Sequence, residues 1–563
     1  MNTENKNPTD NEINNLIKEF QNGKFNIAIK QASSITKKFP KYQFAWKILA
    51  ILLGITGRAN EAIQANQEAI NLSPNDFEVY NNLGNAFKAI GKLDDAINSY
   101  NQAITIKQDY AEAHNNMAIT YKELGEFTKA IRSFKQAITI KPDYAEAYNN
   151  LAFTLNENGK LEESEKNFQN AIKLNPKYAE AYNNLGLTLK ELGKLEESEK
   201  NCKKAIELQP KYFEAYNNLA LTQKELGKLD DSEKNYKKAI ELRPDYAEAK
   251  FNLSMLLNLK GNLELGLKLY EWRLYKKKRI TKAPRKELVW DGIESIENKK
   301  FLIYEEQGFG DIFQFYRFLP LLQQKGAEVI FKVKPNLHNL LKSSNDKIRF
   351  VDTLNGNVEI NFEAPLMSLP HLLKTEINTI PSDIPYLYSD NKKIDEWSKK
   401  LKTDKLKIGI CWQGSKKKID IGRSFSLSYF KDISEINGLQ LISLYKGEDE
   451  DKILDINFDL KTLGRNFDEG NNAYIDTAAV IMNCDLIITS DTSIAHLAGA
   501  LGRPVWVALK FIPDWRWMLK ITQSPWYPTM TLYRQENLNN WDSVFSSIKK
   551  DLISMISHKK LKK

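Results

Sequence analysis

Residues 179–212 read AEAYNNLGLTLKELGKLEESEKNCKKAIELQPKY, and variants of this stretch fill the first half of the chain. Its glycine belongs to a series whose members lie 34 residues apart, and prolines form a second series with the same period, interrupted once by Gln108. A small residue follows each glycine by five positions. Such a period predicts stacked repeats, because one unit alone is too small to bury its apolar face. The glycines are Gly23, Gly57, Gly91, Gly125, Gly159, Gly193, Gly227 and Gly261.

Each unit is predicted to be a pair of amphipathic helices. The glycine permits the turn between them, the small residue lets them approach closely, and the proline ends the second helix. Over residues 9–280, this pattern resembles the tetratricopeptide repeat family, which implies an all-α superhelix. The first unit has fewer large apolar residues, and the last has Lys278 in place of the proline, so we expect both to be caps or transitions.

An asparagine recurs on the first helix of six predicted units. Stacking would align these amides in a ladder, and a carboxamide both donates and accepts, so a ladder can hold an extended peptide backbone. The position resembles the asparagine ladder in the repeats of O-linked N-acetylglucosamine transferases. The alternatives are a tolerated polar residue on a solvated face and a carrier or partner-protein surface. The six residues are Asn82, Asn116, Asn150, Asn184, Asn218 and Asn252.

The composition is that of a large globular protein: 563 residues, 42% hydrophobic and 11% aromatic, with a net charge of +9. The three cysteines show no CxxC spacing, which excludes a disulfide framework and a cysteine-rich zinc site and fits a reducing cytosol. We therefore expect a cytoplasmic protein with no integral membrane segment. The basic clusters 276–279 and 559–563 are interpreted as linker and terminus rather than nucleic-acid surfaces.

The 34-residue period stops after Lys278, and short apolar runs then alternate with helical segments. This alternation predicts parallel sheets with crossover helices. We expect a Rossmann-like half over 286–391, a linker helix over 392–405, a second Rossmann-like half over 406–557 and a basic tail over 558–563. Predicted strands cover 301–304, 327–333, 348–351, 406–412, 439–444, 486–489 and 505–509.

Two segments stand where such a fold places chemistry, between a strand and a helix. The first contains Gly308, Gly310 and Asp311; the glycines let backbone approach a ligand, and the simplest role for Asp311 is to cap the helix. The second runs from Asp485 to Gly502, and its helix start would offer hydroxyls and N–H groups to a diphosphate. Asp491 is expected to cap that helix or bind a sugar hydroxyl. His496, as a lone helix histidine, has a structural alternative.

Together these segments look like the ADP-heptose:lipopolysaccharide heptosyltransferase family over about residues 286–557, and closest to its bacterial relatives fused to tetratricopeptide repeats. Further support comes from residues 290–292, 422–424, 513–517 and 524–528. The resemblance implies a two-domain glycosyltransferase B-type fold that uses nucleotide-diphosphate sugars as co-substrates, with no metal and no other cofactor. It implies that the half over 286–391 is the acceptor side and that the half over 406–557 binds the nucleotide sugar. It also implies that Asp311 is the general base and that Asp491, Thr492, Ser493 and His496 bind the donor.

Inversion is the expected stereochemistry, since one base and no covalent nucleophile are implied. Arg423 or Lys446 is predicted to help neutralise the departing nucleoside diphosphate, with a solvated surface position as the alternative for each. Two departures leave the donor sugar open: Ser493 stands where the family commonly has glycine, and residues 444–447 replace a common Leu-Gln. Residues 449–451 satisfy a DxD pattern, which we interpret as part of an acidic loop rather than a metal site.

The sequence thus favours a glycosyltransferase whose repeats recruit a protein or peptide acceptor. One alternative is a transferase for a saccharide or lipid-linked cell-envelope acceptor, with repeats that dock partner proteins. The other is a non-catalytic repeat scaffold. Loss of Asp311 or of the segment from Asp491 to His496 would have indicated decay, and both are intact.

Overall fold

The structure, a computed structural model, describes residues 7–276, 283–354, 359–414, 422–447, 456–464, 467–469 and 473–561. It divides into two compact units, residues 1–222 and residues 223–563. The boundary falls within the repeat series rather than near residue 280, where the periodicity ends. The last repeats therefore belong to the second unit.

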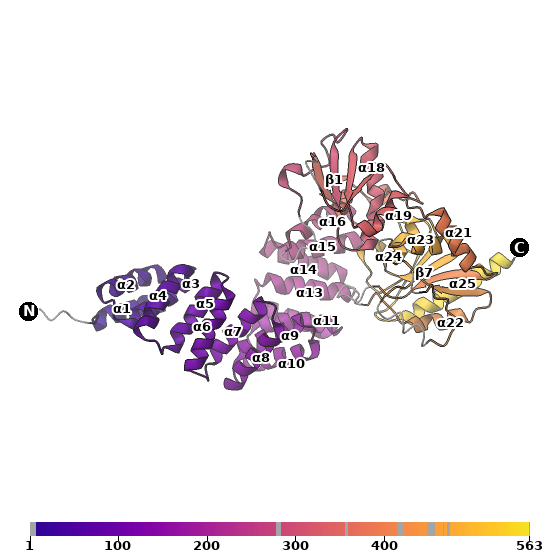
Figure 1. The fold of residues 1–563 in the computed structure, drawn as a ribbon. Helices are drawn as coiled ribbons and strands as arrows, with labels where there is room; N and C mark the ends of the chain where they lie inside the picture. The colour runs from indigo at the N-terminus through magenta and orange to yellow at the C-terminus, as the bar shows by residue number, and fades with distance from the viewer. Residues whose placement is uncertain are drawn as a thin grey trace, which may run out of the picture. The chain divides into compact units, whose positions relative to one another are not determined.

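The first unit consists of α-helices arranged in pairs, one pair to each 34-residue repeat (Figure 1). From α1 to α12, each helix contacts the next one along the chain, both within a pair and between pairs. The helices are α1 (Asp10–Gln21), α2 (Phe25–Lys38), α3 (Gln43–Ile55), α4 (Ala59–Leu72), α5 (Phe77–Ala89), α6 (Leu93–Ile106), α7 (Ala111–Glu123), α8 (Phe127–Ile140), α9 (Ala145–Glu157), α10 (Leu161–Leu174), α11 (Ala179–Glu191), α12 (Leu195–Leu208) and α13 (Phe213–Glu225), which crosses the boundary.

The turn inside each pair is formed by the glycine of the repeat series. Gly193 has φ +77°, a left-handed conformation that costs a residue with a side chain about 1 kcal/mol. Five residues later, the Ser198 hydroxyl donates to the Gly186 carbonyl on the partner helix over 2.7 Å. A Cβ on Gly186 would lie only 2.5 Å from Cys202 Sγ. Small residues at both positions are therefore what allow the two helices to pack closely, as the sequence predicted.

The second unit opens with the last repeat helices, α14 (Leu229–Leu242), α15 (Ala247–Leu259) and α16 (Leu263–Tyr270), followed by the 3-10 turn η1 (Glu271–Tyr275). Leu263, Leu267 and Tyr270 are buried in the same hydrophobic core as the strands that follow. The end of the repeat array is thus a structural part of the α/β unit. Lys278, expected to mark a transition, lies outside the described residues.

The first sheet has four parallel strands in the order β3-β2-β1-β4. The strands are β1 (Lys300–Tyr304), β2 (Glu328–Lys332), β3 (Arg349–Val351) and β4 (Phe362–Pro365). The sequence predicted the first three and missed β4, a four-residue strand that ends in proline. The accompanying helices are η2 (Lys286–Leu288), α17 (Phe309–Phe315), η3 (Tyr316–Phe318), α18 (Leu319–Gln324), η4 (Pro335–Leu337), α19 (His338–Lys342), η5 (Leu366–Ser368), α20 (Leu369–Leu372) and η6 (Ile377–Thr379).

The second sheet has five parallel strands in the order β6-β5-β7-β8-β9. The strands are β5 (Leu406–Cys411), β6 (Leu439–Ser443), β7 (Leu486–Ser490), β8 (Val505–Leu509) and β9 (Met530–Arg534), of which only β9 was not predicted. Its helices are η8 (Leu427–Phe430), α22 (Lys431–Ser434), α23 (Ile475–Asn483), α24 (Ser493–Ala500), η10 (Trp515–Trp517) and α25 (Trp541–Leu561). Helix α21 (Asn391–Lys400) precedes this sheet; it begins one residue before the range 392–405 predicted for a linker helix and ends five residues before that range does.

The two sheets share one hydrophobic core, which includes Phe301 and Phe331 of the first and Ile487 and Val507 of the second. Strand β1 leads into α17 and strand β7 leads into α24, and these two helices are in contact. The carboxyl ends of two central strands therefore bring two helix starts together. The structure describes no side chains within the expected basic tail 558–563.

Candidate active site

The first helix start is organised by the predicted residues Gly308 and Asp311. Gly308, not Asp311, is the N-cap of α17. Asp311 is the third residue of the helix, and its Oδ2 accepts the backbone N–H of Gly308 at 2.9 Å. This corrects the simple capping role considered from the sequence: the carboxylate reaches back to the N-cap, which fixes both its rotamer and the turn before it.

The other carboxylate oxygen of Asp311 forms an ion pair with the guanidinium of Arg516 in η10. The two side chains are 17% and 9% exposed, so the pair is largely shielded from water. Arg516 also pairs with Asp514 over 2.8 Å. Burial raises the pKa of Asp311, while Arg516 opposes that rise by stabilising the ionised form. Asp311 is thus a partly buried carboxylate that its cationic neighbour helps to keep charged.

The second helix start belongs to α24, whose N-cap is Thr492. The Thr492 side chain makes no capping hydrogen bond; its Oγ1 lies 3.1 Å from Thr489 Oγ1 instead. The Ser493 hydroxyl lies 2.8 Å from the Tyr474 hydroxyl. The Ala495 N–H donates to the Thr492 carbonyl at 3.1 Å, which leaves the first two N–H groups of α24 for an anion. Asp491 precedes the N-cap, so the expectation that it caps this helix is wrong.

The two helix starts touch at Gly310 and His496. A Cβ on Gly310 would lie 2.9 Å from His496 Cδ2 and 3.4 Å from Ser493 Cα, so only glycine allows this approach. His496 Nδ1 is 3.1 Å from the Tyr527 hydroxyl, and its ring stacks on Trp517 with centroids 5.1 Å apart. Burial and the nearby Arg516 lower the pKa of His496 to about 3. The imidazole is therefore neutral at pH 7 and acts as a hydrogen-bonding group rather than a cation.

Asp491 lies in a charged cluster with Arg423 and Asp514. Burial and Asp514 raise the pKa of Asp491, and Arg423 opposes that rise. Asp514 shows the opposite result, because Arg516 holds its pKa below the usual value despite burial. The structure thus brings Arg423 into the neighbourhood of the α24 helix start. It does not do so for Lys446, whose exposed side chain donates to the backbone carbonyl of Phe467.

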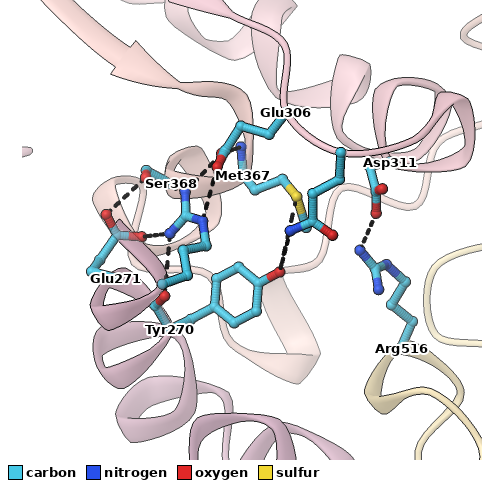
Figure 2. Close-up of polar contacts among 9 residues, drawn as sticks. Tyr270, Glu271, Glu306, Asp311, Met367, Ser368 and Arg516 are labelled. Carbon is cyan, nitrogen blue, oxygen red and sulfur yellow. Dashed lines mark hydrogen bonds and ion pairs between the residues drawn. The ribbon is translucent and has the colours of Figure 1, made fainter. Parts of the chain in front are cut away.

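A second ionic cluster lies beside Asp311, at the end of the repeat array (Figure 2). Glu306, in the loop between β1 and α17, is buried and pairs with Arg273 of η1 over 2.7 Å. Tyr270 of α16 faces the same loop. The loop that leads to Asp311 is therefore held by residues of the last repeat.

A pocket of about 750 Å³ opens at the carboxyl ends of the first sheet's strands. Glu306 and Gln307 border it, but Thr492, Ser493 and His496 do not. Its lining combines acidic, basic and apolar side chains, among them Glu305, Lys332, Lys334, Asp352 and Leu354.

The repeat asparagines form the predicted ladder, but in an unexpected way. Each of four of them donates from Nδ2 to the Oδ1 of the asparagine 35 residues earlier, in the preceding repeat. These partners were not predicted, although five units show an Asn-Asn pair in the sequence. Each of these asparagines thus uses one side-chain N–H to hold neighbouring repeats together, and its Nδ2 carries a second N–H. The bonds are Asn116 to Asn81 (3.0 Å), Asn150 to Asn115 (3.2 Å), Asn184 to Asn149 (3.5 Å) and Asn218 to Asn183 (2.9 Å). Asn82 and Asn252 hold the equivalent positions on α5 and α15.

Several site residues had no predicted role. Arg516, Trp517 and Tyr527 lie in tryptophan-rich stretches that supported the family resemblance, and that clustering was the available signal. No sequence signal pointed to Arg317. It is buried, and its guanidinium donates to the Tyr386 hydroxyl and to backbone carbonyls that include that of Trp526.

The described part of the chain shows neither a metal site nor a membrane span. Within it, no three His, Cys, Asp or Glu side chains are placed to hold a metal ion. No helix there has both the length and the apolar character needed to cross a bilayer. The DxD residues 449–451 lie outside the described residues.

Comparison with known proteins identifies the helical part. Residues 22–253 match the family model described as the cilia and flagella-associated protein 70 C-terminal domain, a tetratricopeptide-repeat family. One curated relative is protein FlbA of Caulobacter vibrioides, 23% identical over 311 residues, or 49% of this chain and 51% of FlbA. The chain thus spans about half the length of this relative.

Similar solved structures are also repeat proteins. The peptide-binding protein YrrB is 22% identical with a TM-score of 0.29, covering 33% of this chain and 96% of YrrB. A tetratricopeptide repeat protein of Parabacteroides merdae is 16% identical with a TM-score of 0.37, covering 44% of this chain and 98% of the other.

Proposed function

We propose that this tetratricopeptide-repeat protein is an inverting, metal-independent glycosyltransferase. It would transfer a sugar from a nucleotide-diphosphate donor to a hydroxyl group of a protein or peptide that the repeats recruit. The observation that carries the proposal is the meeting of two helix starts at the carboxyl ends of parallel strands. One carries a partly buried carboxylate, and the other has an N-cap whose side chain makes no capping bond. In a glycosyltransferase B-type fold, these two groups would face acceptor and donor respectively.

Asp311 would act as the general base. A carboxylate has about four lone-pair positions, and hydrogen bonds to Gly308 and Arg516 use one on each oxygen. The remaining positions can accept the proton of an acceptor hydroxyl as its oxygen attacks the anomeric carbon. Burial makes the carboxylate a stronger base than a surface aspartate, and Arg516 keeps it ionised. Both conditions are needed for a base that works near pH 7.

The C–O bond to the donor diphosphate breaks as the new glycosidic bond forms, and the diphosphate leaves with added negative charge. The N–H groups at the start of α24 and the cation of Arg423 would stabilise that charge. Neutral His496 would supply a hydrogen bond without competing for the proton. Since Asp311 would act as a base toward the acceptor and no carboxylate would form a covalent intermediate with the sugar, the configuration at the anomeric carbon would invert.

The experiment is a calorimetric and thermal-shift screen of the full chain against nucleotide-diphosphate sugars, with and without EDTA. A ligand at 100 times its Kd should stabilise the protein by about 2.7 kcal/mol. Thr492→Val should weaken the response, because it removes the hydroxyl at the α24 N-cap while the backbone N–H groups remain. Thr154→Val is the matched control: its hydroxyl bonds within its own repeat helix, to the Asn150 carbonyl at 2.8 Å. A donor that binds only with a divalent metal would contradict the proposal.

A non-catalytic scaffold is the second candidate. It is favoured by the pocket near Glu306, which the predicted donor-binding residues do not line. If no donor binds and a peptide library still binds to the repeats, the scaffold is the better description.

A further inference from the structure

Arg273, in the 3-10 turn after the last repeat helix, is buried with every N–H group engaged. A guanidinium has five N–H groups. Nε donates to Glu306 Oε1 at 3.0 Å, and Nη2 donates to Glu306 Oε2 at 2.7 Å and Ser368 Oγ at 2.8 Å. Nη1 donates to Glu271 Oε1 at 2.6 Å and to the Tyr270 carbonyl at 3.3 Å. Such complete pairing points to a fixed hub rather than a surface charge.

Glu306 connects this hub to the loop between β1 and α17. Both of its oxygens are bound by Arg273, and Oε2 also accepts the Met367 backbone N–H at 3.1 Å. Arg273 is 7% exposed and Glu306 3%, so neither charge can be returned to water without opening the core. The carboxylate thus locks the second residue after β1 to the end of the repeats (Figure 2).

Tyr270 holds the next residue of the loop. Its hydroxyl accepts a hydrogen bond from Gln307 Nε2 at 3.2 Å. Gln307 has φ +55°, a conformation that L-residues rarely adopt and that the surroundings must maintain. The Tyr270 ring also packs against Trp515, with centroids 6.0 Å apart, and Trp515 is the neighbour of Arg516.

From these contacts we infer that Tyr270 and Arg273 of the last repeat are positioning residues for the Asp311–Arg516 site. Two routes lead from the repeat end to the same ion pair. One runs from Arg273 through Glu306 and the loop to the Gly308 N–H that Asp311 accepts. The other runs from the Tyr270 ring through Trp515 to Arg516. The repeat array would therefore help to build the site as well as recruit a partner.

The inference rests on the proposed function only where it treats Asp311 as the base. A general base must lie within hydrogen-bond reach of its proton, and a misplacement of about 1 Å can lower a rate by about 10²-fold. The positioning itself is a statement about the loop, and backbone exchange measures it without any substrate.

The test compares hydrogen–deuterium exchange of residues 307–312 in Tyr270→Phe and wild type. Loss of the Gln307 hydrogen bond should speed exchange there by about fivefold, the factor that corresponds to about 1 kcal/mol. Tyr100→Phe is the matched control, because the Tyr100 hydroxyl also bonds to a side-chain amide within the repeats, at Asn85 Oδ1, 2.7 Å away. It should leave exchange over 307–312 unchanged.

Arg273→Lys is the second variant, since it keeps the charge but offers three donors in place of five. It should also accelerate exchange over 307–312 and, where a donor has been found, lower kcat with little change in donor Kd. Unchanged exchange in both variants would overturn the positioning role, whatever the activity. Accelerated exchange in a protein that transfers no sugar would instead uphold the positioning role and remove the proposed function.

Discussion

Asp311→Asn is the most informative single substitution, because it removes a charge and almost no volume. The new side chain can still accept the Gly308 N–H through its amide oxygen, so the first turn of α17 should survive. Arg516 loses one of two carboxylate partners and keeps Asp514 at 2.8 Å. Complete loss of a buried partner costs about 3–5 kcal/mol. With one partner retained, we expect about 2 kcal/mol.

The expected effect on transfer is much larger than the effect on folding. Removal of a general base should reduce kcat by about 10²–10⁴-fold. A domain with a stability of about 10 kcal/mol that loses 2 stays more than 99.9% folded, so unfolding cannot account for such a loss. Donor binding should change little, since the α24 helix start is untouched.

The assay pairs calorimetric donor titration with transfer kinetics on the same preparations. Asp468→Asn is the control, because Asp468 is also a partly buried carboxylate, but it caps α23 by accepting the Asp476 N–H at 2.8 Å. It should lose stability without a specific loss of transfer. Full turnover by Asp311→Asn would refute the general-base role, and equal losses in both variants would show that stability alone is being measured.

Three further outcomes are expected. The pKa of His496 falls from 6.5 to about 3 on folding. The neutral imidazole therefore favours the folded state above pH 6.5, and this contribution is lost as the pH falls toward 3. His496→Gln should reduce the loss of stability between pH 7 and pH 4.5 by about 2 kcal/mol, measured by urea titration at each pH. Asn184→Ala should lower the free energy of unfolding by about 1 kcal/mol, because it breaks the hydrogen bond to Asn149, and it should weaken peptide binding. Asn167→Ala is the control, because Asn167 Nδ2 bonds to the Glu163 carbonyl of its own helix, and it should leave peptide affinity intact. A chain that begins at residue 209 should fold and show a cooperative thermal unfolding transition. A chain that begins at residue 283 should not, because it lacks Leu263, Leu267 and Tyr270 of the shared core. A cooperative transition of the shorter chain would contradict this prediction.

The repeat architecture was predictable because its determinants are local. Gly193 must adopt a left-handed turn and Gly186 must admit a neighbouring helix, and both needs recur every 34 residues. Seven strands were predictable for a similar reason, since each is a short apolar run. Strands β4 and β9 were missed because their pairing is set by neighbours far away in the sequence.

The candidate site was predictable only where one segment supplies the chemistry. Asp311 and Thr492 stand at strand-to-helix junctions, which sequence pattern can locate. The partner of Asp311 is Arg516, 205 residues later, and no local pattern shows that they meet. The buried pair Arg273–Glu306 was missed for the same reason. Lys446 followed a predicted strand as Arg423 did, yet its side chain bonds to a nearby loop carbonyl.

The hydrogen bonds between the asparagine side chains of the ladder join residues 35 positions apart, one more than the repeat length. Removal or duplication of any of the three 34-residue units over 111–212 would leave each surviving donor asparagine opposite a suitable partner, whereas an insertion of any other length would interrupt the series. The array can therefore gain or lose reach in steps of one unit while its internal bonding stays intact. Such steps stop before α14, since beyond that point the helices are part of the α/β core.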